Sequence, residues 1–550
     1  MYRMLYFCSG LSQYGGTGHP VRSRKMLLIR WRTCGRNAYR NITFGAQGFF
    51  MKGIKWIRKY SLIGCLCLCA PAVWSQTRDQ PNILFIAIDD LNDWVGALGG
   101  HPQVKTPHLD RLAERGFVFT NAHTQSPLCN PSRSSLLTGL RPGSTGIYGL
   151  APRYRTSERT KNVISLPQFL ARHGYHTISG GKILHGGLTA EERASEFIEW
   201  GPDGGFGPFP EQKLVQKQLD MVDHPLIDWG PFPVKSDTGI LDYKLATWAS
   251  ERLLELGETD SAQPFFLAVG FHKPHVPLYV SQKWFDLYPL DDLILPSAPR
   301  GDRMDIPDFA WYLHWFLPEP RLSWLIRHQE WKAKVQAYLA CVSFVDAQVG
   351  RVMDALEATG LDRSTIVVLW SDHGYHLGEK DITGKNSLWE PSTRVPLIFA
   401  GPGIPRGEKS HEAVELLDIY PTLSEMAGLP SRPDLEGIAL TPFFQKPNYQ
   451  RDRPAITTHN PNNHAVRNRG WRYISYANGS EELYDMVRDP HEYQNLAHLP
   501  EYDSIKWAMK EWLPEPNLPL APGSQHRILE QRGADWFWEG EKIDFDDLID

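Results

Sequence analysis

Five apolar runs, separated by longer amphipathic segments, organise the middle of the chain. Four of these runs are continuous rather than alternating, which is typical of strands buried on both faces of a parallel sheet. The segments between them place apolar residues at helical spacing. The predicted strands are Pro81–Ile88, His176–Ser179, Pro264–Val269, Thr365–Trp370 and Val395–Ala400, and the predicted helices are Thr106–Arg115, Pro131–Thr138, Leu166–His173, Tyr243–Leu256 and Trp331–Leu356.

The character of the chain changes after about residue 430, where short alternating segments such as Ala465–Arg469 and Trp471–Tyr476 replace the long runs. With 550 residues, the chain exceeds the size of one typical core. We therefore expect a larger α/β domain over residues 76–430 and a smaller domain over residues 431–550. Residues 516–550 are rich in Pro, Trp and acidic residues and predict no particular element.

The first 75 residues differ from the rest, because they hold 12 Lys and Arg but no Asp or Glu. A basic start at Met51, an apolar run over Ser61–Val73 and small residues up to Ser75 predict a signal peptide over residues 51–75. The protein is therefore expected to be secreted or periplasmic. The apolar run is too short to span a membrane. Residues 1–50 are interpreted as a misassigned extension, and the short apolar run before Cys65 disfavours lipidation there.

Charge and cysteine content narrow the function of the remaining chain. After residue 75 there are 46 Lys and Arg against 63 Asp and Glu, a net charge of −17, so nucleic acid is not an expected partner. An anionic substrate would need a local cluster of cations. Only Cys129 and Cys341 of the seven cysteines lie after residue 75, which argues against a disulfide framework. Cys341 is expected to fill the core of its long helix.

Carboxylates follow two of the predicted strands. Asp89 and Asp90 come directly after Pro81–Ile88, and Asp372 with His373 follows Thr365–Trp370. The carboxyl ends of parallel strands share one edge of a sheet, where α/β proteins place their sites. Adjacent carboxylates repel each other unless a cation lies between them. These residues therefore form a candidate site for a hard divalent cation.

Cys129 opens the segment Cys-Asn-Pro-Ser-Arg, which leads into Ser-Ser-Leu-Leu-Thr-Gly. Pro131 fits the first turn of a helix and Gly139 its end. Cys129 is thereby predicted at a helix N-terminus, where N–H groups and the helix dipole favour an anion. Arg133 adds a positive charge nearby. A cysteine in this position is a candidate nucleophile.

The motif Cys-x-Pro-Ser-Arg, together with Pro-Asn-Ile-Leu-Phe-Ile-Ala-Ile-Asp-Asp at residues 81–90, resembles the signatures of type I sulfatases. Six motifs match in family order over roughly residues 80–500. The resemblance implies an alkaline-phosphatase-like sandwich with a large, mainly parallel sheet, and a C-terminal α+β domain with an antiparallel sheet and one helix. It also implies a closing helix over Val414–Ala427. In that family the cysteine is converted by a formylglycine-generating enzyme to formylglycine (3-oxoalanine), whose hydrate is a gem-diol.

The resemblance also implies the roles of individual residues. A metal ion, calcium rather than magnesium because the set is mainly carboxylate, is expected on Asp89, Asp90, Cys129, Asp372 and His373. The expected catalytic residues are Cys129, Arg133, Lys182, His185, His275 and Lys385, of which Lys182, His275 and Lys385 also bind substrate. His272 is expected only to support the loop. One hydroxyl of the gem-diol would attack sulfur, His275 or Lys385 would protonate the leaving alcohol, and His185 would deprotonate the second hydroxyl.

Within the family, Pro225–Ala249 and Phe265–Pro277 look most like iduronate-2-sulfatases, which also have His at the position of His373. The leading expected substrate is thus a 2-O-sulfated uronic acid in a glycosaminoglycan or an ulvan-type polysaccharide. Three alternatives stay open at this point. They are a phosphatase or phosphodiesterase on the same fold, a carbohydrate-binding pseudo-enzyme with unmodified Cys129, and a thiol hydrolase.

Overall fold

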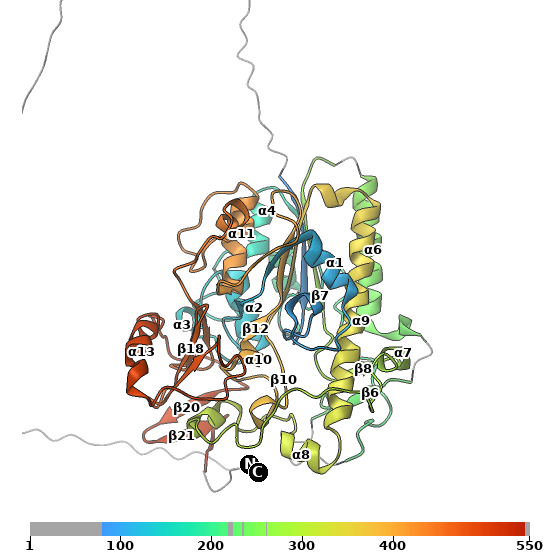
Figure 1. Cartoon of the computed structure of the whole chain (residues 1–550). Helices are drawn as coiled ribbons and strands as arrows, with labels where there is room; N and C mark the ends of the chain where they lie inside the picture. Colours follow the sequence, from blue (N-terminus) through green and yellow to red (C-terminus); the bar gives the residue numbers. More distant parts are fainter. Residues whose placement is uncertain (1–79, 218–223, 234–235, 260, 545–550) are drawn as a thin grey trace, which may run out of the picture. The chain divides into compact units, whose positions relative to one another are not determined.

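A mixed sheet of eight strands is the central element of the described part of the chain (Figure 1). Its spatial order is β14-β2-β13-β9-β1-β7-β4-β5. Neighbouring strands β9, β1, β7 and β4 are all parallel, whereas β13 runs antiparallel to both β9 and β2. The bounds are β1 Asn82–Ile88, β2 Gly116–Phe119, β4 His176–Gly181, β5 Glu199–Trp200, β7 Phe265–Phe271, β9 Thr365–Ser371, β13 Leu397–Ala400 and β14 Glu408–Ser410.

The computed structural model describes residues 80–217, 224–233, 236–259 and 261–544. The predicted extension (1–50), the predicted signal peptide (51–75) and Cys65 lie outside these residues. Residues Gln76–Asp550 group as one compact unit. Among the described helices, none combines the length and the apolar character needed to cross a bilayer.

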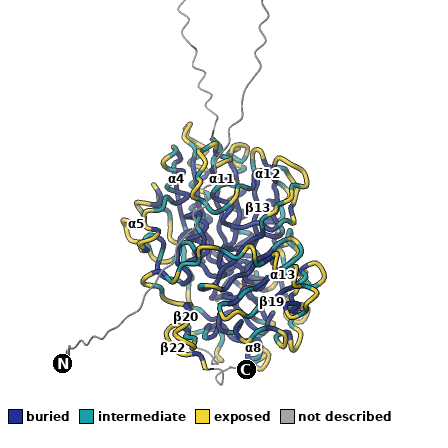
Figure 2. The backbone as a smooth tube through the Cα atoms, turned by 90° about the vertical axis from the view of Figure 1, so that its left-hand side faces the viewer, coloured by how far each residue is buried: buried dark blue, intermediate teal, exposed yellow. Residues whose placement is uncertain are grey.

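Both faces of the sheet are covered by helices, as the continuous apolar runs predict (Figure 1). Along β1, Leu84, Ile86 and Ile88 pack into the core on one face, and Ile83, Phe85 and Ala87 pack into the core on the other. Figure 2 shows the buried backbone concentrated inside the molecule and the exposed backbone in peripheral loops. One face carries α1 Pro107–Arg115, α6 Leu241–Glu258 and α9 Trp331–Ala358, and the other carries α2 Cys129–Thr138, α4 Leu166–Arg172 and α11 Ile419–Met426.

Two predicted elements are divided in the structure. The predicted strand Val395–Ala400 breaks at Pro396, which has no N–H for the ladder, so β12 Arg394–Val395 pairs with β3 while β13 joins the central sheet. The predicted helix Val414–Ala427 begins only at Ile419. Its first two residues form β15 Val414–Glu415, because they pair in parallel with β3 Ala122–His123.

The C-terminal part of the described chain contains the expected antiparallel sheet and helix. Strands β16 to β19 form a four-stranded antiparallel sheet, and α13 Asp503–Lys510 packs against it. A three-stranded sheet follows, in the segment where the sequence predicts no element. The bounds are β16 Ala455–Thr458, β17 His464–Arg467, β18 Trp471–Ser475, β19 Glu481–Asp485, β20 Leu529–Arg532, β21 Asp535–Trp538 and β22 Glu541–Lys542.

Shorter elements connect these layers. Two of them, β6 and β8, pair in parallel beside the loop that carries His275. The bounds are β6 Trp229–Pro231, β8 Leu278–Val280, β10 His376–Leu377, β11 Thr383–Gly384, α3 Pro142–Thr145, α5 Ala190–Glu196, α7 Gln282–Phe285, α8 Leu322–Arg327, α10 Glu390–Thr393 and α12 Thr441–Gln445.

Candidate active site

The carboxyl ends of four adjacent parallel strands deliver polar side chains to one edge of the sheet. Ile88 lies opposite Ser371 of β9 and Phe271 of β7, and Gly270 lies opposite Gly181 of β4. The residues that follow these positions therefore start from the same level. They are Asp89 and Asp90 after β1, Asp372 and His373 after β9, His272 to His275 after β7, and Lys182 to His185 after β4.

The three carboxylates are fully buried and hold one another in place. The backbone N–H groups of Asp90 and His373 both donate to Oδ1 of Asp372, each at 3.1 Å. Asp90 has a φ of 60°, a left-handed conformation that a non-glycine residue adopts only when its surroundings impose it. Its Oδ2 is buried and has no hydrogen-bond partner among the described residues. This carboxylate oxygen at the carboxyl end of β1 is therefore available to bind a cation.

Cys129 is the first residue of α2 and lies against this cluster. Its Sγ is 3.1 Å from Nε2 of His373, and only 2% of the residue is exposed. Gly139 ends the helix with a φ of 74°, as predicted, whereas the helix begins at Cys129, two residues before the predicted start at Pro131. Ser132, one turn along, donates from Oγ to the carbonyl of Asp372 at 2.6 Å. This bond ties the helix start directly to the end of β9.

Three cations surround Cys129 and the carboxylates. Arg133 bridges two strand ends, because its Nε donates to Asp372 at 2.8 Å and its Nη2 donates to Asp89 at 3.0 Å. Lys385 lies 2.7 Å from Oδ1 of Asp90 and 3.3 Å from Sγ of Cys129. Lys182 forms an ion pair with Asp89 and lies 3.7 Å from the same sulfur. Each lysine is thus bound to a different carboxylate, Lys182 to Asp89 and Lys385 to Asp90, and both lie next to position 129.

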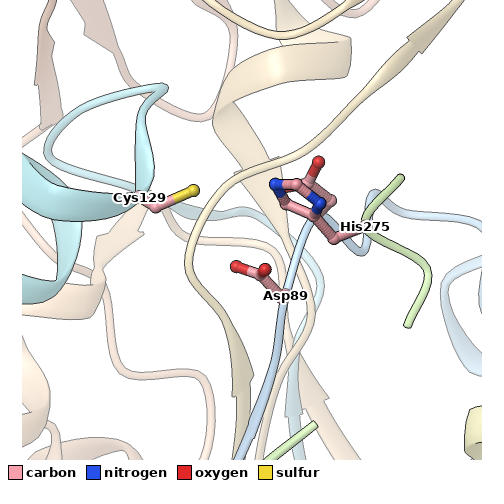
Figure 3. A group of neighbouring side chains, drawn as sticks. Asp89, Cys129 and His275 are labelled. Atoms are coloured by element: carbon pink, nitrogen blue, oxygen red, sulfur yellow. The ribbon is translucent and has the colours of Figure 1, made fainter. Parts of the chain in front are cut away.

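Two histidines complete the immediate surroundings of position 129. His275, Asp89 and Cys129 come from three different elements and point toward a common space (Figure 3). Nδ1 of His275 lies 2.6 Å from its neighbouring carbonyl at Val276, which leaves Nε2 for the site. His185 interacts with the Cys129 thiol and lowers its pKa. His272 serves the loop, since its Nδ1 accepts the N–H of Gly205 at 3.2 Å.

The cations decide the ionisation of the cluster. Burial opposes ionisation of Cys129, yet Lys182 and Lys385 bring the pKa of the thiol well below its usual range. Burial likewise opposes the charged form of Asp89, but Lys182 holds the pKa of that carboxyl well below its usual range. Burial works against protonation of His373, and Asp372 nevertheless raises the pKa of that imidazole to about 9. The site therefore stabilises an anion at position 129.

The donor set fits a hard divalent cation. Ligand atoms of Asp89, Asp90, Cys129 and His275 lie within 4.8 Å of one another, and those of Cys129, Asp372 and His373 do so as well. Carboxylate oxygens dominate the set, which suits calcium or magnesium. The sequence prediction gives His275 a catalytic and a substrate-binding role but does not include it among the metal ligands, whereas the structure places it in the first of these groups. Cys341, by contrast, is fully buried in α9, and burial raises the pKa of its thiol to about 12.

Several positioning residues carry no signal in the sequence. The hydroxyl of Tyr338, on α9, donates to the carbonyl of Asp90 at 2.7 Å and accepts the N–H of Asn92 at 3.0 Å. Asp242, on α6, accepts the N–H groups of His272 and Lys273 at 3.0 and 2.8 Å. These contacts join residues 30 to 248 positions apart. The one sequence signal for Asp242 is that a charged residue occupies a position on the apolar face of its helix.

Comparison with known proteins identifies the family that has this arrangement. The sequence profile of the sulfatase family matches residues 81–429. The chain belongs to the sulfatase family. A second profile, described as the C-terminal part of N-sulphoglucosamine sulphohydrolase, matches residues 378–517 of this sulfatase. The chain is accordingly a sulfuric ester hydrolase, and its fold is that of the sulfatases and alkaline phosphatases.

Individual relatives support the same assignment. A sulfatase of Formosa agariphila is 43% identical over 485 residues, which cover 84% of this chain and 92% of that protein. Human iduronate 2-sulfatase is 32% identical over 431 residues, which cover 69% of this chain and 74% of that protein. Among solved structures, a 2-O glycosaminoglycan sulfatase superimposes with a TM-score of 0.61 at 24% identity, and the match covers 78% of this chain and 90% of that chain.

Proposed function

We propose that this sulfatase removes a 2-O-sulfate from a uronic acid in a sulfated carbohydrate, with an oxidised Cys129 as its nucleophile. The observation that carries the proposal is the convergence of Cys129 with three carboxylates and three cations at one sheet edge. The uronate assignment is supported by the relative named iduronate 2-sulfatase.

Conversion of Cys129 to formylglycine would supply a hydrated aldehyde with two hydroxyl groups at the start of α2. The two lysine Nζ atoms lie 3.3 and 3.7 Å from Sγ. During attack by the first hydroxyl, the sulfuryl oxygens of a substrate would therefore lie within reach of both ammonium groups. Lys182 and Lys385 therefore offset the charge that grows on these oxygens. Arg133 keeps Asp89 and Asp372 at fixed orientation.

The reaction needs two proton transfers, one to the departing sugar oxygen and one from the second hydroxyl of the gem-diol, and a histidine can serve in each. His275, with Nε2 directed to the site, or Lys385 donates a proton to the departing sugar oxygen. His185, in contact with position 129, accepts the proton of the second hydroxyl, so that sulfate leaves and the aldehyde is restored. A bound divalent cation on Asp89, Asp90, Asp372 and His373 would polarise a sulfate oxygen.

Maturation and export belong to the same proposal. We infer that a formylglycine-generating enzyme acts on the Cys-x-Pro-Ser-Arg segment and that residues 51–75 direct secretion. The mass of the peptide that contains Cys129 tests the first inference, because conversion exchanges a thiol for an aldehyde and lowers the mass. An unmodified Cys129 in active enzyme would contradict the proposed nucleophile.

The substrate is tested with a desulfation screen. Protein co-expressed with a formylglycine-generating enzyme is incubated with 2-O-sulfated uronate disaccharides, ulvan oligosaccharides, an aryl sulfate and an aryl phosphate, and released anion is measured by ion chromatography. We expect sulfate from the 2-O-sulfated uronates and no phosphate from the aryl phosphate. Sulfate released only from another sugar would overturn the uronate assignment. Phosphate release that exceeds sulfate release would favour the phosphatase alternative.

A further inference from the structure

A large cavity is lined by the C-terminal segment together with Leu150, His224, Phe316 and Pro318. Its volume is about 690 Å³, within the usual range for a site that binds a small molecule. Of the nine described residues that line it, five fall within residues 526–541. This segment lies beyond both sequence profiles, which end at residues 429 and 517. The wall is therefore a feature of this chain rather than of the profiles it matches.

Hydrogen bonds connect this wall to the start of α2. Asn130, next to Cys129, donates to the carbonyls of Gly149 and Pro152 at 2.9 and 3.0 Å. The loop between those two carbonyls bonds in turn to the C-terminal segment, because the N–H of Leu150 donates to His526 at 3.2 Å. The cavity is thus coupled to position 129 through a single loop.

Arg527 stands out among the lining residues. It is partly exposed, and its guanidinium has no hydrogen bond or ion pair with any described residue. Its backbone is held on both sides, since its N–H donates to Glu539 at 2.6 Å and its carbonyl accepts from Asn460 at 3.1 Å. The φ of 64° places Arg527 in the left-handed region, which an arginine adopts only when its surroundings impose it.

The positive charge of Arg527 acts on two nearby histidines. Together with burial, it disfavours the protonated forms of His224 and His459 and lowers the pKa of both. His224 lines the same cavity. His459 lies 3.4 Å from Asn386, the neighbour of Lys385. An anion placed between Arg527 and His224 would therefore lie in the cavity that Leu150 also lines, beside the loop that is bonded to the neighbour of Cys129.

We propose that Arg527 determines substrate specificity by binding a second anionic group of the sulfated sugar inside this cavity. The group is a carboxylate or a second sulfate, both of which a guanidinium binds through two parallel hydrogen bonds. Phe316 offers an apolar surface in the same cavity for the face of a sugar ring. Glu539 and Glu541 also line the cavity. Because their carboxylates repel an anion, the anionic group binds only at the part of the wall formed by Arg527. The proposal rests on the sulfatase function proposed above.

The test compares Arg527→Gln with Arg532→Gln. Arg532 is the last residue of β20 in the same C-terminal segment, is exposed, pairs with Glu530 at 2.6 Å and is not among the residues that line the cavity. Three substrates are used: a 2-O-sulfated uronate disaccharide, its methyl ester, and that ester with a second sulfate. A charged hydrogen bond lost from the bound state raises KM by roughly 10-fold to 100-fold, with kcat little changed.

Each outcome decides between the sources of the anion. A rise in KM for Arg527→Gln on the free acid but not on the methyl ester identifies the carboxylate. A rise confined to the disulfated ester identifies the second sulfate. An equal KM for wild type and Arg527→Gln on all three substrates overturns the proposal. A loss of the same size on all three also overturns it, because the effect would then be on the active site as a whole.

The proposed function can fail separately. If wild-type protein with confirmed formylglycine releases no sulfate from any of the three substrates, the substrate assignment is wrong. The cavity is then tested by calorimetric titration with the desulfated uronate disaccharide and with inorganic sulfate. Weaker binding of either probe to Arg527→Gln, but not to Arg532→Gln, supports the role of Arg527. Equal binding to wild type and both variants refutes it.

Discussion

The hydroxyl of Tyr338 offers a test of how the fold fixes Asp90 in its left-handed conformation. In Tyr338→Phe the ring remains, while the carbonyl of Asp90 and the N–H of Asn92 both lose a partner. Both groups lie in the fully buried interior. A buried polar group left without a partner costs about 1–3 kcal/mol, so two such groups predict a loss of about 2–6 kcal/mol of unfolding free energy.

Tyr375 provides a matched control. It is as buried as Tyr338, its ring stacks on Tyr338 with centroids 5.4 Å apart, and its hydroxyl has no hydrogen-bond partner among the described residues. Tyr375→Phe therefore removes the same atom without breaking a bond. We expect it to change the unfolding free energy by less than about 0.5 kcal/mol, or to stabilise the protein, because an unpaired buried hydroxyl is itself unfavourable.

Thermal and urea unfolding measure both variants. For a chain of this size the entropy of unfolding is on the order of 1 kcal/mol per kelvin, so Tyr338→Phe should lower Tm by about 2–6 °C. Calcium titration of the folded variants gives a second readout, because a misplaced Asp90 should weaken binding by roughly 10-fold to 100-fold. Equal Tm values for the two variants would refute the reasoning. Unchanged calcium binding in Tyr338→Phe would show that Asp90 keeps its position without this hydroxyl.

Three further predictions follow from charged groups. Arg472→Met leaves Glu390 and Glu492 without their buried partner and should lower the unfolding free energy by about 3–5 kcal/mol, measured by urea unfolding. Chelation of the divalent cation should abolish sulfate release and lower Tm, because a ligand at 100 times its Kd stabilises the folded state by about 2.7 kcal/mol. Added calcium should restore both the activity and the Tm at a lower concentration than added magnesium. Burial lowers the pKa of Lys334 to about 8, although the negative charge of Glu319 acts in the opposite direction. The charged form of Lys334 therefore destabilises the folded state, and it is populated at low pH. Wild-type stability relative to Lys334→Met should rise by about 3 kcal/mol between pH 8 and pH 10.5, and a flat difference would contradict this.

The sequence was most informative where chemistry and chain direction coincide. Asp89 and Asp372 each follow a continuous apolar run, and parallel pairing of β1 with β9 brings the two ends to one level. Because this pairing follows from the buried character of both runs, the meeting of the two carboxylates could be predicted. The placement of Cys129 at a helix start could also be predicted, since Pro131 fits the first turn of the helix and Gly139 ends it.

Other features depend on partners that no local pattern reveals. The split of Val395–Ala400 is marked by Pro396, but the assignment of its halves to different sheets depends on β3 and β9. The start of α11 moves to Ile419 because Val414 pairs with Ala122. In the C-terminal segment, β20 and β21 are short strands whose exposed residues give no clear alternation. Its contribution to the cavity therefore appears only in three dimensions.

Charge balance connects the composition of the chain to the proposed reaction. The chain after residue 75 carries a net charge of −17, which repels a sulfated polysaccharide at long range. At the site, the charges of Arg133, Lys182 and Lys385 match those of the three carboxylates with which they pair. A divalent cation on those carboxylates would leave a local charge of about +2, in a buried site where screening by salt is weak. The attraction for sulfate then arises only within a few ångströms of position 129. We therefore expect added salt to change the sulfate-release rate of this enzyme less than it would for an enzyme with a basic surface, and a steep loss of kcat/KM between low and moderate salt would show that long-range attraction contributes after all.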